Sequence, residues 1–524
     1  MDSALTANLE PQPGPVGPSS GNITSAVAVS RGASYLTIQI IITSAAQALA
    51  FAILARLITP AEVGILAILS LIIALAQTLN GGAFTLAATT FIGELASGSR
   101  EAASAVFYQS LRVTVLFSVP ISAVVFLAAP AIASRLLGSI AQAGLFRFLA
   151  IDVLVYSGAL PVAIGTLLGM KRFKEVATIG SAGIILRQCL IVLLIILMRN
   201  LVGLVIGWIL SDLAMFVAYA VFILRVLGLP KKSFSVRKLI SFSWPLSIEN
   251  AIGFVYSWFD RAILIAFVPL ASLGVYNASL TAFGVLSGIT GSVNSALLPA
   301  YSDIHGRSGL ESCRRATWLA SRYASLVMVP LSFGLLATAK VALTTFVGQA
   351  YGSGAASLAI LSFFFALTAY GSVLGIMLVA LSQTRTALLI TIASTLLAIA
   401  SAYVLLPLMG ITGASIARGL AMVISVLLGI IVLKRKNAIS IDLTTFWKTL
   451  AAGGVMAGVL VLVQMVFYSR ILLPAYIILG AIIYVAALRL LKAVKEHDIE
   501  LIHRYLGTRL GFVSKVLGVI LVAK

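Results

Sequence analysis

Apolar residues fill long runs along nearly the whole chain, and short polar segments separate these runs. A helix needs about 20 predominantly apolar residues to cross the hydrocarbon core of a bilayer, and the runs have about that length. The pattern therefore predicts an all-α polytopic membrane protein with about 14 transmembrane helices. The predicted spans are residues 33–56, 62–84, 105–130, 145–168, 176–198, 201–224, 244–268, 275–298, 316–338, 356–380, 386–408, 411–433, 447–468 and 471–491.

The chain is also internally duplicated. An offset of 210 residues separates four pairs of identical residues: Gly64 and Gly274, Arg112 and Arg322, Pro120 and Pro330, and Gly138 and Gly348. Each copy holds an even number of predicted spans, so both copies enter the membrane in the same direction. We expect two parallel six-helix repeats related by a pseudo-two-fold axis along the membrane normal, followed by two C-terminal helices. This organisation is typical of transporters, in which the binding site lies between the two halves.

The predicted spans and the polar segments between them divide the chain into six parts. These parts are a disordered cytoplasmic tail (1–30), a first six-helix bundle (31–228), a basic cytoplasmic linker (229–243), a second six-helix bundle (244–436), helices 13 and 14 (437–493), and a cytoplasmic amphipathic tail (494–524). The apolar residues of the last part recur at helical spacing. They predict either an interfacial helix on the inner leaflet or a helix packed on the cytoplasmic face of the bundle.

Composition narrows the possible chemistry. With 60% hydrophobic and 10% charged residues, a chain of 524 residues lacks the charge that a soluble surface needs. The two cysteines and three histidines show no disulfide framework and no metal-ligand spacing. We therefore expect no metal site and no cofactor.

The net charge of +20 comes from basic residues that flank the predicted spans. Spread in this way, they indicate contact with an anionic inner leaflet and argue against nucleic acid as a partner. Most of the 36 Lys and Arg residues lie in the N-terminal segment, the even-numbered loops and the C-terminal segment. The odd-numbered loops carry only Arg56, Arg135, Arg147, Arg199, Lys340 and Arg470. By the positive-inside rule, the protein is multi-pass in the cell membrane with both termini cytoplasmic.

Several ionisable residues fall within the predicted spans, where each costs roughly 2.5–3.5 kcal/mol at the membrane centre. They are Arg112, Asp152, Arg187, Asp212, Glu249, Asp260, Arg261, Arg322 and Arg418. Arg112 and Arg322 lie near cytoplasmic span ends and either snorkel to the headgroups or face the interior. Arg187 lies in the middle of its span. It either pairs with Asp212 or Asp152 of a neighbouring helix or forms a cationic wall for an anionic substrate.

Spans 7 and 8 each carry a stripe of polar and small residues at helical spacing. The span 7 stripe is Glu249, Gly253, Tyr256 and Asp260. The span 8 stripe is Asn277, Thr281, Gly284, Gly288 and Gly291. We interpret the first as one wall of a water-filled lumen, and the three glycines of the second as a close helix contact. Asp260 and Arg261, toward the outer end of span 7, are also placed to pair locally.

Three segments resemble a known family. They are the R-L-x-x-P-x-E-x-G segment with Arg56, Pro60 and Gly64, the D-R…G-x-Y segments with Asp260, Arg261, Gly274 and Tyr276, and Gly410-Ile-Thr-Gly-Ala-Ser-Ile416 at the opening of span 12. The family is the O-antigen-flippase-like polysaccharide transporters of the multidrug/oligosaccharidyl-lipid/polysaccharide exporter superfamily. The resemblance covers about residues 30–490 and includes the arrangement of two six-span repeats and two further spans.

The resemblance implies a flippase that moves a polyprenyl-(pyro)phosphate-linked oligosaccharide from the cytoplasmic to the outer leaflet by alternating access. It makes the lipid-linked glycan the main partner and glycan-synthesis enzymes candidate partners. Under this reading, the pyrophosphate is neutralised by Arg187, with Arg112, Arg322 and Arg418 as further candidates. Glu249, Tyr256, Asp260, Arg261 and Asn277 are candidates for the cavity and its gating. The motif residues Arg56, Pro60, Gly64, Gly274 and Tyr276 are expected to shape the loops.

Two other functions compete with this one. A cation-coupled multidrug exporter of the same superfamily would use acidic residues in its lumen, and Glu249, Asp260 and Asp212 are available for that role. A membrane enzyme that transfers or polymerises glycans needs carboxylates on external loops. The odd-numbered loops hold only Glu62. We therefore expect a transport protein and no enzyme.

Overall fold

The computed structural model describes residues 20–95, 99–230, 233–435, 439–494 and 498, and these residues form helices joined by short turns, with no strand among them. The α-helices are α1 (Ser20–Leu57), α2 (Pro60–Ala76), α3 (Gly82–Leu95), α4 (Arg100–Leu137), α5 (Ala143–Val153), α6 (Leu160–Gly169), α7 (Phe173–Met198), α8 (Val202–Leu227), α9 (Val236–Phe267), α10 (Leu270–Ala337), α11 (Ala339–Phe346), α12 (Ala355–Leu367), α13 (Gly371–Ala380), α14 (Thr384–Met409), α15 (Ile411–Arg435), α16 (Leu443–Val466) and α17 (Leu473–Leu490).

The structure confirms an all-α polytopic protein. Within the described residues, 13 helical segments are long and apolar enough to cross a membrane. The predicted seventh span corresponds to α9, which is 32 residues long, carries Glu249, Asp260 and Arg261, and is not one of these 13 segments. The predicted tenth span is divided between α12 and α13 by a turn at residues 368–370.

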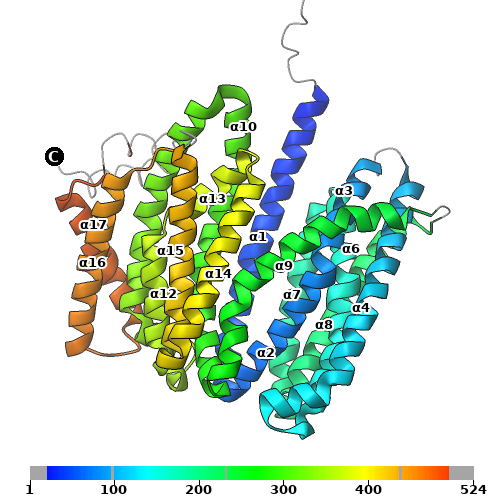
Figure 1. The fold of residues 1–524 in the computed structure, drawn as a ribbon, viewed down its shortest axis with the longest axis horizontal. Helices are drawn as coiled ribbons and strands as arrows, with labels where there is room; N and C mark the ends of the chain where they lie inside the picture. The colour runs from blue at the N-terminus through cyan, green and yellow to red at the C-terminus, as the bar shows by residue number, and fades with distance from the viewer. Residues whose placement is uncertain (1–19, 96–98, 231–232, 436–438, 495–497, 499–524) are drawn as a thin grey trace, which may run out of the picture.

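The helices form two groups (Figure 1). One group contains α2 to α8, and the other contains α10 and α12 to α17, with α1 and α9 running between them. In sequence order α1 belongs to the first half, and it packs along α7. The second-half helix α9 packs against α14 of its own half and against α3 of the first half. The two halves also meet where α2 of the first half packs against α10 of the second.

Three helical segments depart from simple spans. The predicted spans 8 and 9 are parts of one helical segment of 68 residues, α10, which is broken by the positive φ of 70° at Gly309. Because glycine has no Cβ, it adopts this φ without steric cost and allows the segment to turn back. In the first half, π-helical turns interrupt two spans, at Gln77–Gly81 and at Leu154–Ala159. Such π-turns are frequently found at functional sites.

The predicted tails lie mostly outside the described residues. Residues 1–19 and 499–524 are outside them, so the disordered N-terminal tail and the amphipathic C-terminal tail stay predictions. Helix α1 begins at Ser20, within the segment expected to be disordered. The expected linker at 229–243 includes the start of α9 at Val236.

Candidate functional site

A cavity of about 1050 Å³ lies between the two halves of the molecule. Its walls come from α1, α2, α3, α6, α7, α8 and the two π-turns on one side and from α9 and α10 on the other. Two cations face it from opposite halves, Arg187 on α7 and Arg261 on α9. The uncharged polar residues on its wall include Gln39, Gln47, Gln77, Gln188, Asn277 and Thr281. The cavity therefore combines polar groups and positive charge from both halves with a largely apolar wall.

Arg187 is held at the cavity wall by one carboxylate and two aromatic rings. Its Nη1 lies 3.3 Å from Oδ1 and 3.2 Å from Oδ2 of Asp212 on α8. The guanidinium carbon lies 4.9 Å from the ring centre of Trp208 and 5.2 Å from that of Tyr156, both within the range of cation–π attraction. Its side chain keeps 16% of its surface exposed. The salt bridge to Asp212 expected from the sequence is present, and Arg187 still faces the cavity.

Behind this ion pair lies a second carboxylate, Asp152 on α5. Its side chain is fully buried, and both of its oxygens lack a hydrogen-bond donor among the described residues. The side chain within its hydrogen-bonding reach is another carboxylate, Asp212. The described structure thus places two carboxylates and one guanidinium in the interior of the first half.

Arg261 approaches the cavity from the second half. Its guanidinium carbon lies 3.6 Å from the ring centre of Trp258, and Nη2 donates to the carbonyl of Ser257 at 3.1 Å. Its Nε is buried without a hydrogen-bond acceptor among the described residues. This Nε also lies 3.9 Å from Oδ1 of Asp260, so the local pairing expected from the sequence is present, and Arg261 still faces the cavity.

Asp260 precedes Arg261 in the chain and also pairs with a second arginine of the second half. It is fully buried and accepts two hydrogen bonds from Arg418 of α15, from Nε at 2.6 Å and from Nη2 at 2.9 Å. The hydroxyl of Tyr276 on α10 donates to the same carboxylate. Asp260 therefore joins α9, α10 and α15, and this network occupies the guanidinium of Arg418. Arg418 and Tyr276 do not line the cavity, and the network does not support Arg418 as a residue that binds substrate.

The motif glycines meet where α2 packs against α10. A Cβ built on Gly64 would lie 2.0 Å from the carbonyl oxygen of Leu270, and one built on Gly274 would lie 1.8 Å from the carbonyl oxygen of Pro60. Only glycine permits this approach of α2 to α10. The two residues are equivalent in the internal duplication, so the contact lies on the pseudo-two-fold axis.

The segment before this contact is fixed by local hydrogen bonds. Thr59 caps α2, its hydroxyl accepting from the backbone N–H of Glu62, while the Glu62 carboxylate accepts from the backbone N–H of Thr59. Arg56, the first residue of the motif, donates to the carbonyl of Thr345 in the second half. The described contacts therefore agree with the expected role of Arg56, Pro60, Gly64 and Gly274 in loop geometry.

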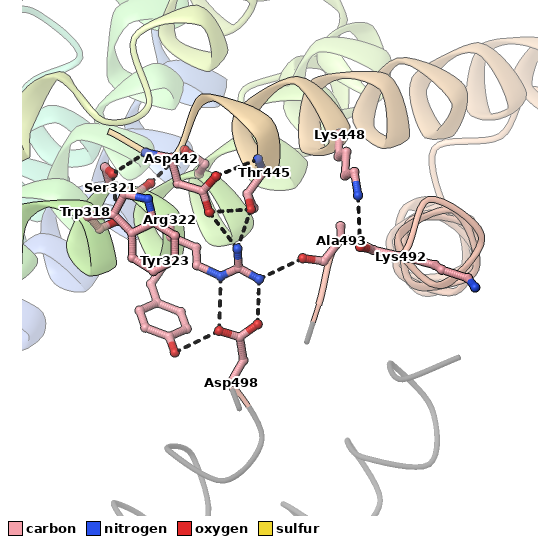
Figure 2. Close-up of polar contacts among 11 residues, drawn as sticks. Trp318, Ser321, Arg322, Tyr323, Asp442, Thr445, Lys448, Lys492, Ala493 and Asp498 are labelled. Atoms are coloured by element: carbon pink, nitrogen blue, oxygen red, sulfur yellow. Dashed lines mark hydrogen bonds and ion pairs between the residues drawn. The ribbon is translucent and has the colours of Figure 1, made fainter. Parts of the chain in front are cut away.

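Arg322 does not line the cavity and lies in a cluster of polar contacts (Figure 2). Its Nη1 donates to Asp442 at 2.6 Å and to the hydroxyl of Thr445 at 2.6 Å. Its Nε and Nη2 donate to Asp498 at 3.0 and 2.6 Å, and Nη2 also donates to the carbonyl of Ala493 at 2.9 Å. The side chain is 2% exposed. Two carboxylates neutralise this guanidinium, so the structure does not support Arg322 as a substrate site.

The role of Arg322 is instead to join the two C-terminal helices to the second half. Burial alone would raise the pKa of the Asp442 carboxyl, but hydrogen bonds from Thr445 and Arg322 lower that pKa overall. Arg112, the duplicate of Arg322, is exposed on α4 and does not line the cavity.

The polar stripes of spans 7 and 8 differ from the expectation in two ways. Glu249 and Gly253 line a separate cavity of about 510 Å³ between α9, α14 and the π-turn at Gln77–Gly81, whereas Asp260 is buried in the second half. Tyr256 is half-buried and packs against the apolar core. The stripe on α9 is therefore not the wall of one lumen.

On α10, Gly284, Gly288 and Gly291 have open space where a Cβ would stand, and the first two line the main cavity. The prediction of a close helix contact there was wrong. These glycines widen the cavity next to Asn277 and Thr281.

A third cavity, of about 630 Å³, is almost wholly apolar and adjoins the main one. It lies among α1, α10, α11, α16 and α17, and it shares Ala48, Phe51 and Thr281 with the wall of the main cavity. The two helices outside the duplication thus form one side of an apolar groove. No sequence pattern predicts this groove, because its lining residues are ordinary apolar residues from distant segments.

Solved structures show the same fold. The lipid II flippase MurJ in its inward closed conformation aligns with a TM-score of 0.67 at 14% identity, covering 89% of this chain and 98% of that chain. An outward-facing multidrug resistance MATE family transporter of the MOP superfamily aligns with a TM-score of 0.57 at 18% identity, covering 77% and 95%. A MOP superfamily transporter from Pyrococcus furiosus Vc1 (DSM3638), described as having reverse polarity of its binding pocket, gives 0.54 at 17%, also covering 77% and 95%.

The chain therefore shares its fold with a lipid II flippase and with transporters of the MOP superfamily. More closely, the chain belongs to the polysaccharide biosynthesis protein family, whose model matches residues 53–356, more than half of its length. A search of curated protein sequences finds no significant match.

Proposed function

We propose that this protein moves a polyprenyl-(pyro)phosphate-linked oligosaccharide from the cytoplasmic to the outer leaflet of the cell membrane by alternating access. In this proposal both termini are cytoplasmic, as the distribution of Lys and Arg indicates. The contact between Gly64 and Gly274 then closes the cavity toward the outside. The MurJ structure, which the chain covers almost completely, supports an exporter with this architecture.

The observation that carries the proposal is the pair of cations on one cavity. Arg187 belongs to the first half and Arg261 to the second, and both line the same space. Guanidinium groups suit phosphate because their planar N–H groups donate in parallel to its oxygens. An anion held by both would respond to the relative position of the two halves, and alternating access requires that response.

The apolar groove supports a lipid-linked substrate in particular. A polyprenyl chain is a hydrocarbon and needs an apolar environment, whereas the pyrophosphate and glycan need the polar and cationic groups of the main cavity. The groove adjoins the cavity, with Ala48, Phe51 and Thr281 common to both. We assign the groove beside α16 and α17 to the lipid chain and the cavity to the headgroup.

The membrane potential favours movement in the proposed direction. With the cytoplasm negative, outward movement of an anion is assisted by about 2.3 kcal/mol per charge per 100 mV. Multivalent pyrophosphate therefore gains more assistance than a monovalent anion.

A cation-coupled multidrug exporter is the second candidate function. The observation that favours it is Glu249, which lines the smaller cavity together with uncharged polar residues such as Asn250 and Thr391. The MATE structures have the same fold and suit this function equally well. The main cavity, with Arg187 and Arg261, has the charge that repels a cationic drug.

A flipping assay tests the proposal. The protein is reconstituted in liposomes, and movement of a fluorescent polyprenyl-pyrophosphate glycan between leaflets is followed for the wild type, Arg187→Ala, Arg261→Ala and Arg135→Ala. Arg135 is exposed near the end of α4 and away from the cavity, so it is the matched control. We expect flipping by the wild type and the control and loss of flipping in both cavity variants.

Wild-type liposomes that transport a cationic dye and leave the glycan lipid in its original leaflet would contradict the flippase. They would support the multidrug exporter, and Glu249→Gln would be the next variant to test.

A further inference from the structure

The buried carboxylate of Asp152 lacks a hydrogen-bond donor among the described residues. Both of its oxygens are acceptors, no described donor reaches them, and the neighbouring side chain Asp212 is also a carboxylate. Buried polar atoms in proteins are almost always hydrogen-bonded, and an ionised carboxylate only accepts. Two carboxylates can satisfy one another only when a proton lies between them.

The charges around the pair lead to the same conclusion. Arg187 is the cation that touches it, and it contacts Asp212 through Nη1 alone. Two ionised carboxylates with one guanidinium would leave an unpaired negative charge in the apolar interior, which is strongly unfavourable. Binding one proton brings the cluster of Asp152, Asp212 and Arg187 to zero net charge.

The helices packed around α5 supply no second cation. The ring of Tyr156, on the π-turn that follows α5, lies against Arg187 and carries no positive charge. On α4, the residue that contacts the carbonyl of Ala150 is Ser122, an uncharged residue. The charged residues of α2, α4, α5, α7 and α8 other than the cluster itself are Glu62, Arg100, Glu101, Arg112, Arg135, Arg147, Lys174, Glu175 and Arg225. None of them forms a described ion pair with Asp152 or Asp212.

We propose that Asp152 and Asp212 bind one proton between them and that this proton sets the affinity of Arg187 for an anion. The second part of this inference rests on the proposed function, whereas the proton site does not. With the proton present, the carboxyl group of Asp152 donates to Asp212, and Arg187 is balanced by one negative charge. Without it, two negative charges compete with the substrate phosphate for the same guanidinium.

The linkage has a definite sign. Because the proton favours anion binding, an anion at Arg187 must equally favour the proton. Affinity for the anion is therefore high at low pH and falls as pH rises through the titration of the pair, by up to about tenfold per pH unit for one linked proton. In Asp152→Asn the amide donates to Asp212 and cannot ionise, so this fall disappears.

Infrared spectroscopy of the purified protein in nanodiscs, without any ligand, tests the proton site. A buried protonated carboxyl group gives a carbonyl band that is distinct from ionised carboxylates. We expect this band in the wild type near neutral pH and its loss in Asp152→Asn. Asp303→Asn is the matched control, since Asp303 is an exposed partner of Arg307, and that variant should keep the band. A wild-type spectrum without the band, or a band that survives in both Asp152→Asn and Asp212→Asn, overturns the proposal.

A binding titration with farnesyl pyrophosphate tests the link to the anion. Its affinity for the wild type should fall with rising pH more steeply than its affinity for Asp152→Asn. The ionisation of the ligand itself affects both proteins equally and cancels in this comparison. Equal pH profiles overturn the link.

Two further outcomes separate the parts of the argument. An infrared band without any pyrophosphate binding at any pH leaves the proton site standing and contradicts the proposed function. Replacing K⁺ by Na⁺ at constant ionic strength should leave the band unchanged. Loss of the band in Na⁺ would show that the pair binds a metal cation, which contradicts the proton assignment.

Discussion

Each half of the molecule contains a buried arginine–aspartate cluster, and the two clusters are built differently. In the first half, Arg187 contacts Asp212 through one nitrogen at 3.2–3.3 Å and keeps a face on the cavity. In the second half, Arg418 donates from two nitrogens to Asp260, at 2.6 and 2.9 Å, and has no place on the cavity wall.

The difference shows how to separate a structural arginine from one that is free to bind. In the second half, Tyr276 adds a further donor to Asp260, and the network joins three helices. In the first half the cluster has more acidic than basic groups, because Asp152 adds a second carboxylate beside one guanidinium. A cluster in which two nitrogens of the arginine are engaged holds helices together, whereas a loosely engaged arginine beside a cavity is placed to bind an anion.

Removal of the tightly bonded acid should have the largest effect. Asp260→Ala leaves Arg418 buried without its carboxylate, which typically costs about 3–5 kcal/mol of stability. We expect a correspondingly large drop in the free energy of unfolding, measured by denaturant titration in mixed micelles. Asp303→Ala, which removes an exposed ion pair with Arg307, should cost less than about 1 kcal/mol. Similar losses in the two variants would contradict the structural role of Asp260.

The cluster around Arg322 also joins helices, and removing one of its acids should lower the free energy of unfolding by a smaller amount. Asp442→Ala removes one of two carboxylates, so Arg322 keeps Asp498 and the expected cost is about 1.5–3 kcal/mol. Unfolding of wild type and variant in mixed micelles measures it. An unchanged free energy of unfolding would show that this contact does not hold α16 in place.

The same cluster predicts a pH dependence. The pKa of the Asp442 carboxyl is lowered in the folded protein, so its stabilisation is present above the pKa of the unfolded chain. It is lost as the pH falls through the lowered folded value, that is, at and below about pH 4. Thermal unfolding between pH 3 and pH 7 should show this loss in the wild type and a weaker dependence in Asp442→Ala. Parallel pH profiles of the wild type and Asp442→Ala would contradict this contribution of Asp442 to stability.

The smallest expected effect concerns the rings that support Arg187. Trp208→Leu removes one cation–π contact and should weaken farnesyl pyrophosphate binding by about 0.5–1 kcal/mol, a few-fold in affinity. Calorimetric titration measures it. Phe259→Leu, next to Arg418 in the closed cluster, should leave affinity unchanged. A larger loss of affinity in Phe259→Leu than in Trp208→Leu would contradict the assignment of Arg187 to anion binding and of Arg418 to a structural role.

The fold could be predicted well from the sequence because it depends on local patterns of residues and on a repeat within the chain. Apolar run length indicates the spans, and the duplication pairs Gly64 with Gly274, which the structure brings into contact. The pairing of Arg187 with an acid followed from the high cost of an isolated charge in its span. These inferences need only the residues of one segment or a repeat within the chain.

The sequence was less informative where function depends on distant segments. Arg322 is neutralised by residues 120 and 176 positions away, one of them in the C-terminal segment, so nothing in its own span distinguished it from a substrate site. Gly284 and Gly288 have the spacing of a helix contact, but the partner helix is absent and the cavity occupies that space. The apolar groove has no pattern of its own.

The central claim is that an anionic headgroup binds between Arg187 and Arg261. Electron cryo-microscopy of the protein in nanodiscs with farnesyl pyrophosphate tests it most directly. The account predicts phosphate density in the main cavity, contacting both guanidinium groups, with the apolar chain in the groove beside α16 and α17. Phosphate density at Arg112 or outside the cavity, with Arg187 and Arg261 unoccupied, would contradict it.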